Sequence, residues 1–169
     1  MSTLSPRARS WIDALQLEAH PRGGWFREAW QSAEPLPVEA LPGRFPEGRT
    51  FGASWHFVCT EDAPRRFHRR RSDALWLWQG GNPLTLHLLD EDGGYAKRVL
   101  GPNVAQGERL QVHVPHGTWC AAETAVPGSD ALVSLLCVPA CADSDVEEAG
   151  LDAMLGLYPA HESLLRRLS

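Results

Sequence analysis

The chain has 169 residues, of which 43% are hydrophobic and 22% are charged, and its formal net charge is -5. This composition is typical of one globular domain with a sizeable core, and it excludes an intrinsically disordered chain. The acidic balance argues against a general nucleic-acid-binding protein, and no apolar run approaches the roughly 20 residues that span a bilayer. Because residues 1–10 lack the apolar stretch of a signal peptide, we expect a cytoplasmic protein.

The predicted elements begin with a helix over residues 6–18, where Trp11, Ile12 and Leu15 form a partial apolar stripe after Pro6. The glycine pair in residues 20–24 ends it. A strand is predicted over residues 25–30. Residues 33–50 are rich in proline and glycine and are predicted to form a long irregular loop.

From residue 50 to 139 the pattern is that of β-structure. Short strands are predicted over 51–59, 74–78, 84–88, 98–100, 110–114, 119–123 and 131–138, with turn residues between them. Strands at this spacing without intervening helices are typical of an antiparallel sandwich, jelly roll or barrel. Two short helices are predicted within residues 145–168. We therefore expect a single domain over 1–169, with its barrel at about 25–140.

The chain contains seven tryptophans, several of them on predicted strands. Buried indole rings on strands suggest a wide aromatic interior, although simple core filling explains them equally well. The candidates to line a ligand pocket are Trp55, His56, Trp76, Trp78, Gln111, Trp119 and Cys120.

Several short motifs occur in collinear order along almost the whole chain. They are His20-Pro21-x-Gly23-Gly24, Arg66-Phe67-His68, Ser72-Asp73-x-Leu75-Trp76, Leu86-His87-Leu88, Leu100-Gly101-Pro102, Gly107-Glu108-Arg109-x-Gln111, Val114-Pro115-x-Gly117-x-Trp119 and Tyr158-Pro159. Together they resemble the DUF985 family, also called cupin 5. The resemblance implies an all-β fold with terminal helices, the cupin double-stranded β-helix or jelly-roll barrel, usually as a homodimer. It implies little about activity, although the barrel is similar to that of nucleotide-sugar 3,5-epimerases.

The chain departs from the family pattern at positions that would face the cavity. Ala74 stands where the family usually has glutamate, Leu77 where it has histidine, and Cys120 where glutamine or phenylalanine is common. A metal-binding cupin typically supplies three histidines and a carboxylate, of which this sequence retains only His68. We therefore expect no cofactor. The alternative is a rearranged metal site built from His56, His68, His113 and Cys120.

The preferred chemistry is acid–base catalysis without a metal. Arg66 and His68 are two residues apart, so on a regular strand they share one face. An imidazole can move a proton near neutral pH, and a guanidinium can bind a carboxylate or phosphate. Asp73 would orient His68. The alternative is that these three residues form a structural polar network at the rim of the barrel.

Five arginines crowd into residues 65–71. This run would form an electropositive mouth that draws an anionic substrate. The alternative is a solvated rim, which we favour for Arg65, Arg69 and Arg71, paired with nearby acids such as Glu61 and Asp62.

The four cysteines, Cys59, Cys120, Cys137 and Cys141, contain no CxxC pair and are expected to be free thiols. Cys120 is the best candidate for a nucleophile, because it occupies a predicted cavity position. Buried free cysteine is commonly inert, and the other three are interpreted as structural.

The sequence thus predicts a metal-independent small-molecule enzyme, an isomerase, epimerase or lyase that uses His68 as acid/base on a small anionic or sugar-like substrate. One alternative is a cupin that binds a small molecule without catalysis. The other is a metal-dependent dioxygenase or isomerase with the rearranged His/Cys site. The expected partners are a small molecule and a second copy of the chain, without nucleic acid or membrane.

Overall fold

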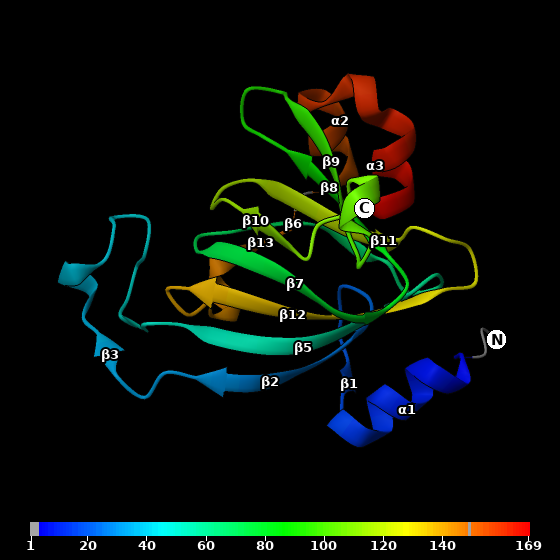
Figure 1. Ribbon diagram of the computed structural model, residues 1–169. Coiled ribbons are helices and arrows are strands. Elements are labelled where there is room, and N and C mark those ends of the chain that lie inside the picture. The colour runs from blue at the N-terminus through cyan, green and yellow to red at the C-terminus, as the bar shows by residue number, and fades with distance from the viewer. Residues whose placement is uncertain (1–3, 149) are drawn as a thin grey trace.

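Two antiparallel sheets form the body of the protein in a computed structural model that describes residues 4–148 and 150–169 (Figure 1). The strands are β1 (Glu18–Ala19), β2 (Trp25–Gln31), β3 (Pro35–Leu36), β4 (Arg49–Thr50), β5 (Ala53–Thr60), β6 (Arg65–Arg70), β7 (Asp73–Gly81), β8 (Leu84–Leu89), β9 (Tyr95–Leu100), β10 (Gln111–Val114), β11 (Trp119–Thr124), β12 (Asp130–Val138) and β13 (Val146–Glu147). One sheet has the order β1-β2-β5-β12-β7-β10, and the other has the order β13-β6-β11-β8-β9. β3 and β4 pair separately.

The order of the strands confirms the predicted jelly roll. From β5 onward the chain crosses between the two sheets at almost every connection, and only β8 and β9 follow each other within one sheet. Every ladder between named strands is antiparallel. Across the described residues the two sheets remain separate ladders and do not close into one continuous barrel.

The α-helices of the described residues flank the sheets: α1 (Pro6–Leu15), α2 (Leu151–Leu157) and α3 (Glu162–Leu168). The hydroxyl of Ser5 accepts the Ala8 N–H at 3.0 Å and caps α1. The helix ends before the predicted residue 18 because Gln16 adopts a left-handed conformation with φ 53°. No helix in the described part of the chain is long and apolar enough to cross a membrane.

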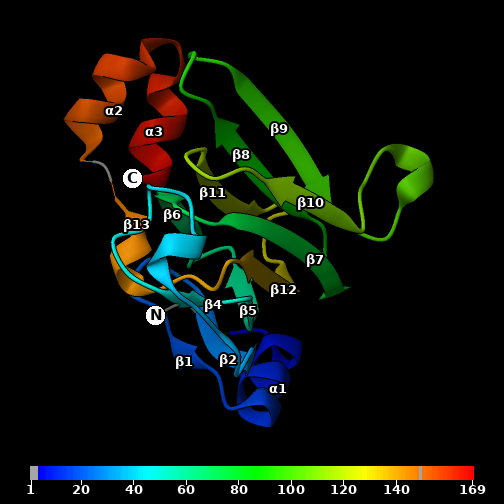
Figure 2. The same cartoon turned by 90° about the vertical axis from the view of Figure 1, so that its left-hand side faces the viewer.

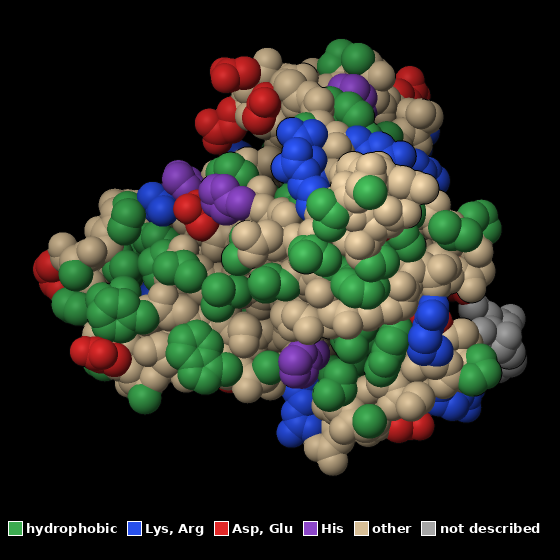
Figure 3. Space-filling view, in the orientation of Figure 1, with side chains coloured by type: hydrophobic (Ala, Val, Ile, Leu, Met, Phe, Trp, Pro, Cys, Tyr) green, Lys and Arg blue, Asp and Glu red, His purple; other side chains and the backbone are tan. Residues whose placement is uncertain are grey.

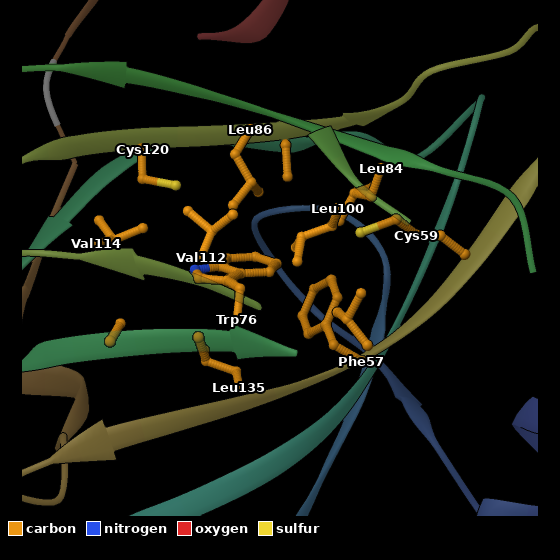
Figure 4. Packing of buried hydrophobic residues seen from close by; sticks show 14 of the residues in the cluster. Phe57, Cys59, Trp76, Leu84, Leu86, Leu100, Val112, Val114, Cys120 and Leu135 are labelled. Atoms are coloured by element: carbon orange, nitrogen blue, oxygen red, sulfur yellow. The ribbon is translucent and has the colours of Figure 1, made fainter. Parts of the chain in front are cut away.

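The main core lies between the two sheets and is filled by side chains (Figure 4). Trp76 of β7 is fully buried at its centre, and the ring of Phe57 from β5 lies 6.3 Å from the indole. Val112, Leu86 and Leu100 reach the same space from the strands around it. The interior is therefore a packed core over most of its length, not the wide aromatic chamber that the tryptophan count suggested.

Two further clusters cover the outer faces of the sheets. α2 and α3 pack on the five-stranded sheet, where Met154 and Leu165 meet Phe67, Leu89 and Trp119. α1 packs on Val58 and Leu132 of the six-stranded sheet. Figures 1 and 2 show α2 and α3 together at the end of the molecule opposite α1. The helices therefore bury the faces of the two sheets that point away from the main core.

The predicted long loop is present and is held to the body by a buried ion pair. It contains β3, the 3-10 turn η1 (Val38–Ala40) and β4. At its end, Arg49 contacts both carboxylate oxygens of Asp145 at 2.7 and 2.6 Å. Asp145 ends the turn η3 (Asp143–Asp145), immediately before β13. The loop is thus tied to the segment that carries one wall of the cavity described next.

Candidate functional site

A cavity of about 70 Å³ lies where the two sheets meet the segment before β13. A single water needs roughly 10–15 Å³ of such space, so the cavity can hold a small molecule or several waters. Aromatic rings form one side, arginines another, and the residues after β12 a third. Its lining consists of His20, Arg22, Phe26, Trp55, Phe57, Arg65, Arg70, Leu135, Cys137, Cys141, Ala142, Asp143 and Val146.

Three arginines give this cavity its positive charge. Arg22 forms an ion pair with Glu148, with Nε and Oε1 2.6 Å apart. Arg65 and Arg70 are only 4% and 7% exposed, and neither has an acidic partner among the described residues. The Nε of Arg65 is buried without a hydrogen-bond partner. Burial, followed by the charges of Arg70 and Arg22, lowers the pKa of Arg65 to about 9.

The remaining contacts of Arg65 hold its side chain in place. One terminal nitrogen meets Nδ1 of His20, and the guanidinium lies 4.7 Å from the centre of the Phe57 ring. A cation over an aromatic ring is a favourable arrangement, but it does not neutralise the charge. Arg65 is therefore a fixed, buried cation with hydrogen-bonding capacity left over for a ligand.

A β-bulge explains why Arg65, and not Arg66, faces this cavity. Between β6 and β11, His68 pairs with Cys120 and Arg65 pairs with Ala122, so β6 carries one residue more than its partner. The extra residue turns the Arg66 side chain out to solvent. The expectation that Arg66 and His68 share a face is therefore wrong, as is the expectation that Arg65 lies on the solvated rim. Arg69 and Arg71 do bind acids, although these are Glu147 and Asp145 and not Glu61 or Asp62.

His68 is fully buried on the inner face of β6, between Arg65 and Arg70 in the chain. Its Nδ1 lies 2.7 Å from the Arg66 carbonyl oxygen. Since a carbonyl only accepts, Nδ1 carries the proton and Nε2 carries the lone pair. That Nε2 is buried without a partner in the described chain. Burial, and then the charges of Arg70 and Arg65, hold the pKa of His68 well below its usual value, so the ring is neutral.

Asp73 does not contact His68. Its carboxylate accepts the backbone N–H of His116 at 2.9 Å and lies 2.9 Å from the Nδ1 of the same residue. The Nε2 of His113 is 3.5 Å away. With 47% of its side chain exposed, Asp73 belongs to a surface cluster at the start of β7. The partner that fixes the His68 tautomer is the Arg66 backbone instead.

Of the tryptophans predicted to line a pocket, only Trp55 lies in the cavity wall. Trp76 and Trp78 face the main core, and their indole nitrogens are buried without a partner among the described residues. Trp119 is packed under the C-terminal helices on the opposite face of its sheet, with the Arg69 guanidinium 4.8 Å from its ring. Trp119 is therefore not a pocket residue.

The polar pocket candidates are likewise separated. Gln111 is exposed on the edge strand β10. His56 lies on the face of β5 opposite Trp55 and Phe57. Cys120 does face the interior, but burial raises the pKa of its thiol to about 12, which leaves it a poor nucleophile.

Comparison with known proteins identifies the fold and the family. The sequence model of the family described as Cupin superfamily (DUF985) matches residues 9–149 of this chain. The chain belongs to this family. A hypothetical protein from Leishmania major has 30% identity and a TM-score of 0.87, with 96% of this chain and 98% of that one covered. A protein from Shewanella oneidensis has 28% identity and a TM-score of 0.85, covering 96% of each chain.

A more distant structure shares only the fold of this cupin. Oxalate decarboxylase from Bacillus subtilis has 14% identity and a TM-score of 0.54, with 89% of this chain and 36% of that one covered. No curated protein matches the sequence. The resemblance indicated by the sequence motifs is therefore confirmed for the family and for the fold.

The residues of this cupin do not fit a metal centre. Of the four alternative ligands, His68 and Cys120 face the interior, but His56 lies on the other face of its sheet and His113 has a 56% exposed side chain. No group of three or more metal-ligating side chains comes together within residues 4–148 and 150–169. The two arginines that flank His68 also oppose a cation there.

His20 is the main site residue that the sequence analysis did not select. Its Nδ1 accepts the Arg22 N–H at 2.9 Å, and the ring also lines the cavity. Two glycines place the loop: Gly23 and Gly24 have φ of 94° and 77°. A Cβ on Gly24 would lie 2.6 Å from the Phe57 ring. The His-Pro-x-Gly-Gly motif is the sequence feature that could have indicated His20, because its glycines let the loop pack closely against Phe57.

The titration of His20 predicts a loss of stability on the acid side. Burial, followed by the charges of Arg65, Arg22 and Arg70, lowers its pKa from 6.5 to about 3. Between these two values the unfolded chain binds the proton and the folded chain does not, so lowering the pH favours unfolding. We expect the melting temperature to fall through this interval and to fall less in His20→Gln. Thermal denaturation followed by tryptophan fluorescence measures both slopes. Identical slopes for wild type and His20→Gln would refute the assignment.

Proposed function

We propose that this cupin is a metal-independent enzyme that acts on a small organic anion, as an isomerase, epimerase or lyase. The proposal rests on one observation: the buried guanidinium groups of Arg65 and Arg70 face a cavity, and no acid of the described chain neutralises them. Burying an uncompensated charge is costly, so a protein that does so twice at one cavity is built to receive the opposite charge.

Charge and size define the class of substrate. Arg22 is already paired with Glu148, and Asp143 is the acid in the lining, so Arg65 and Arg70 leave the cavity with a net positive charge that favours an anion. Guanidinium groups bind carboxylates and phosphates through paired, charge-assisted hydrogen bonds. Phe26, Trp55 and Phe57 offer ring faces to the carbon part of such a molecule. A dicarboxylate or a small phosphorylated sugar meets these requirements.

His68 is the proposed acid/base. Its free Nε2 takes the proton from a carbon next to a carbonyl, the C–H electron pair moves to the carbonyl oxygen, and an arginine stabilises the resulting enolate. Returning the proton to another carbon or to the other face gives isomerisation or epimerisation, and expelling a neighbouring group gives a lyase reaction. Because a bound dianion offsets the charges of Arg65 and Arg70, binding raises the pKa of His68 and prepares it to accept the proton.

A second candidate function is binding without catalysis. The observation in its favour is that the fully buried imidazole of His68 is not part of the cavity wall. In that case the anion binds to the arginines and never reaches Nε2. The two functions share one binding site and differ in whether carbon-bound hydrogen is exchanged.

Incubation with dicarboxylates and sugar phosphates in deuterated water separates the two functions. Every proposed reaction begins with proton abstraction, so catalysis introduces deuterium next to the carbonyl of the substrate, which proton NMR detects. We expect exchange in the wild type and its loss in His68→Asn, with binding kept. Asp73→Asn is the matched control and should exchange normally, because Asp73 contacts His116. Binding without exchange for every bound anion would favour the non-catalytic function, and no binding at all would refute both.

We also propose that the protein is a cytoplasmic homodimer. Trp30, Phe51 and Val138 are 52%, 48% and 52% exposed, and Trp30 and Val138 both lie against Gly52. Figure 3 shows hydrophobic side chains gathered over the face that carries β5, β12 and β7. Apolar surface of this kind favours pairing of two copies. Sedimentation of the wild type beside Trp30→Glu tests this, because a dimer interface here would be weakened by the charge.

A further inference from the structure

Two of the four cysteines lie side by side in the cavity wall. Cys137 is near the end of β12, and Cys141 follows four residues later, beyond Pro139. Both line the cavity, and both pack against the same core cluster. Cys137 is fully buried, whereas Cys141 is partly exposed, with its Sγ 3.5 Å from the Ala142 carbonyl oxygen. The pair therefore spans from the interior to the cavity mouth.

The two thiols share one cavity wall and one packing cluster, and their surroundings favour a thiolate at Cys137. The neighbouring Cys141 lowers the pKa of Cys137 against the opposing effect of burial, and the charges of Arg70 and Arg65 act in the same direction, whereas the pKa of Cys141 is raised. The other two cysteines differ. Burial raises the pKa of Cys59 and of Cys120 to about 12, and neither lines the cavity. Cys59 and Cys120 therefore serve as internal controls of low reactivity for the other two thiols.

We propose that Cys137 and Cys141 are a reactive dithiol in the cavity wall, which a hydroperoxide oxidises reversibly to an intramolecular disulfide. Hydrogen peroxide is little larger than water, and the cavity has room for several waters. The site therefore admits the oxidant to the buried sulfur without unfolding.

The reaction has two steps. The Cys137 thiolate attacks one peroxide oxygen, the O–O bond breaks, and the leaving hydroxide takes a proton to become water, so Cys137 becomes a sulfenic acid. The Cys141 sulfur then attacks the Cys137 sulfur, the S–O bond breaks, and a second water leaves. In total two thiols and one peroxide give one disulfide and two waters, with two electrons passing from sulfur to oxygen. An external dithiol reverses the change by thiol–disulfide exchange.

Oxidation would alter the anion site, because Cys141, Ala142, Asp143 and Val146 form one side of it. A covalent bond to Cys137 fixes that side to β12. We expect the affinity for anions to change between the reduced and oxidised forms. This consequence rests on the proposed function, whereas the oxidation itself does not.

Peroxide titration of the full chain, with thiol labelling and peptide mapping at each time, tests the proposal. We expect Cys137 and Cys141 to lose their free thiols together, at least about tenfold faster than Cys59 and Cys120, because the thiolate is the reacting form. The map should contain a peptide that links residues 137 and 141, and dithiothreitol should restore both thiols. In Cys141→Ser the sulfenic acid should persist at Cys137, where dimedone traps it.

Cys120→Ser is the matched control, since it removes an interior thiol without touching the pair, and it should oxidise as the wild type does. The proposal is overturned if all four thiols react at similar rates, if the disulfide links two chains, or if a different pair is joined. The wild-type labelling alone decides between these outcomes, so a failure of either variant to fold does not affect the test. Because no anion is needed, the result is also independent of the proposed substrate.

Discussion

Replacing Arg65 with methionine should abolish anion binding and, at the same time, raise the melting temperature of the ligand-free protein. Arg65 is a buried cation without an acidic partner in the described chain, so its removal relieves a desolvation cost. Hydrophobic replacement of buried charged groups is often stabilising by about 1–4 kcal/mol. In a domain of this size, each kcal/mol corresponds to roughly 2–4 °C.

The measurement is a pair of thermal denaturation curves for each protein, with and without sulfate as a simple dianion. Wild type should be stabilised by the anion, and Arg65→Met should not respond to it. Arg66→Met is the matched control: it removes an exposed arginine of the same strand and should behave as the wild type. An Arg65→Met protein that melts lower than the wild type without anion, or that still responds to sulfate, would contradict the assignment.

Replacing Asp145 with alanine should cost about 3–5 kcal/mol of folding free energy, because it removes the buried acid that pairs with the buried Arg49. The Asp145 side chain is fully buried and that of Arg49 is 6% exposed. The same carboxylate accepts the Ala142 N–H at 2.9 Å, next to the anion cavity. The variant should therefore lose stability and also weaken anion binding, since the wall is no longer fixed.

Lowering the pH should destabilise the protein in the same way as Asp145→Ala does, because it removes the charge of Asp145. Although burial opposes ionisation, hydrogen bonds from Arg49 and Ala142 hold the pKa of Asp145 below its usual value. A carboxyl with a lowered folded pKa contributes stability above the unfolded value of about 3.9, and the contribution disappears as the pH falls through the folded pKa. Urea denaturation at neutral and acid pH measures both effects. Glu47→Gln is the control, because Glu47 is an exposed partner of Arg49 at 3.4 Å and should change stability by less than about 1 kcal/mol.

Periodicity predicted the strands well, because alternation reports directly which side chains are buried. Residues 111–114 alternate as expected, with Val112 and Val114 inside and Gln111 and His113 outside. The same rule shows why the pocket prediction was partly wrong. Successive side chains on a strand point to opposite faces, so Trp119 and Cys120 cannot both face the interior. In β11 both faces are apolar, because the outer face packs on the C-terminal helices. The sequence of the strand alone therefore does not show which of its residues face the interior.

The arginine site was harder to predict, because it depends on an irregularity in β6. Nothing in the run of residues 65–71 marks where the ladder gains its extra residue. A regular strand places Arg66 beside His68, and the bulge replaces it with Arg65. Arg22 and His20 reach the same cavity from a loop, and only the folded chain brings them there. The His-Pro-x-Gly-Gly motif marks this loop in the sequence, but it does not indicate that the loop closes on the arginines of β6.

The extra residue in β6 also affects how relatives of this protein should be compared. A gap-free alignment with a relative whose strand is regular would set inward side chains of one protein against outward side chains of the other, on one side of the bulge. An arginine that looks substituted in such a column can be present in space one position away. Conservation around this segment should therefore be counted by the direction of the side chain, after superposition, and not by column.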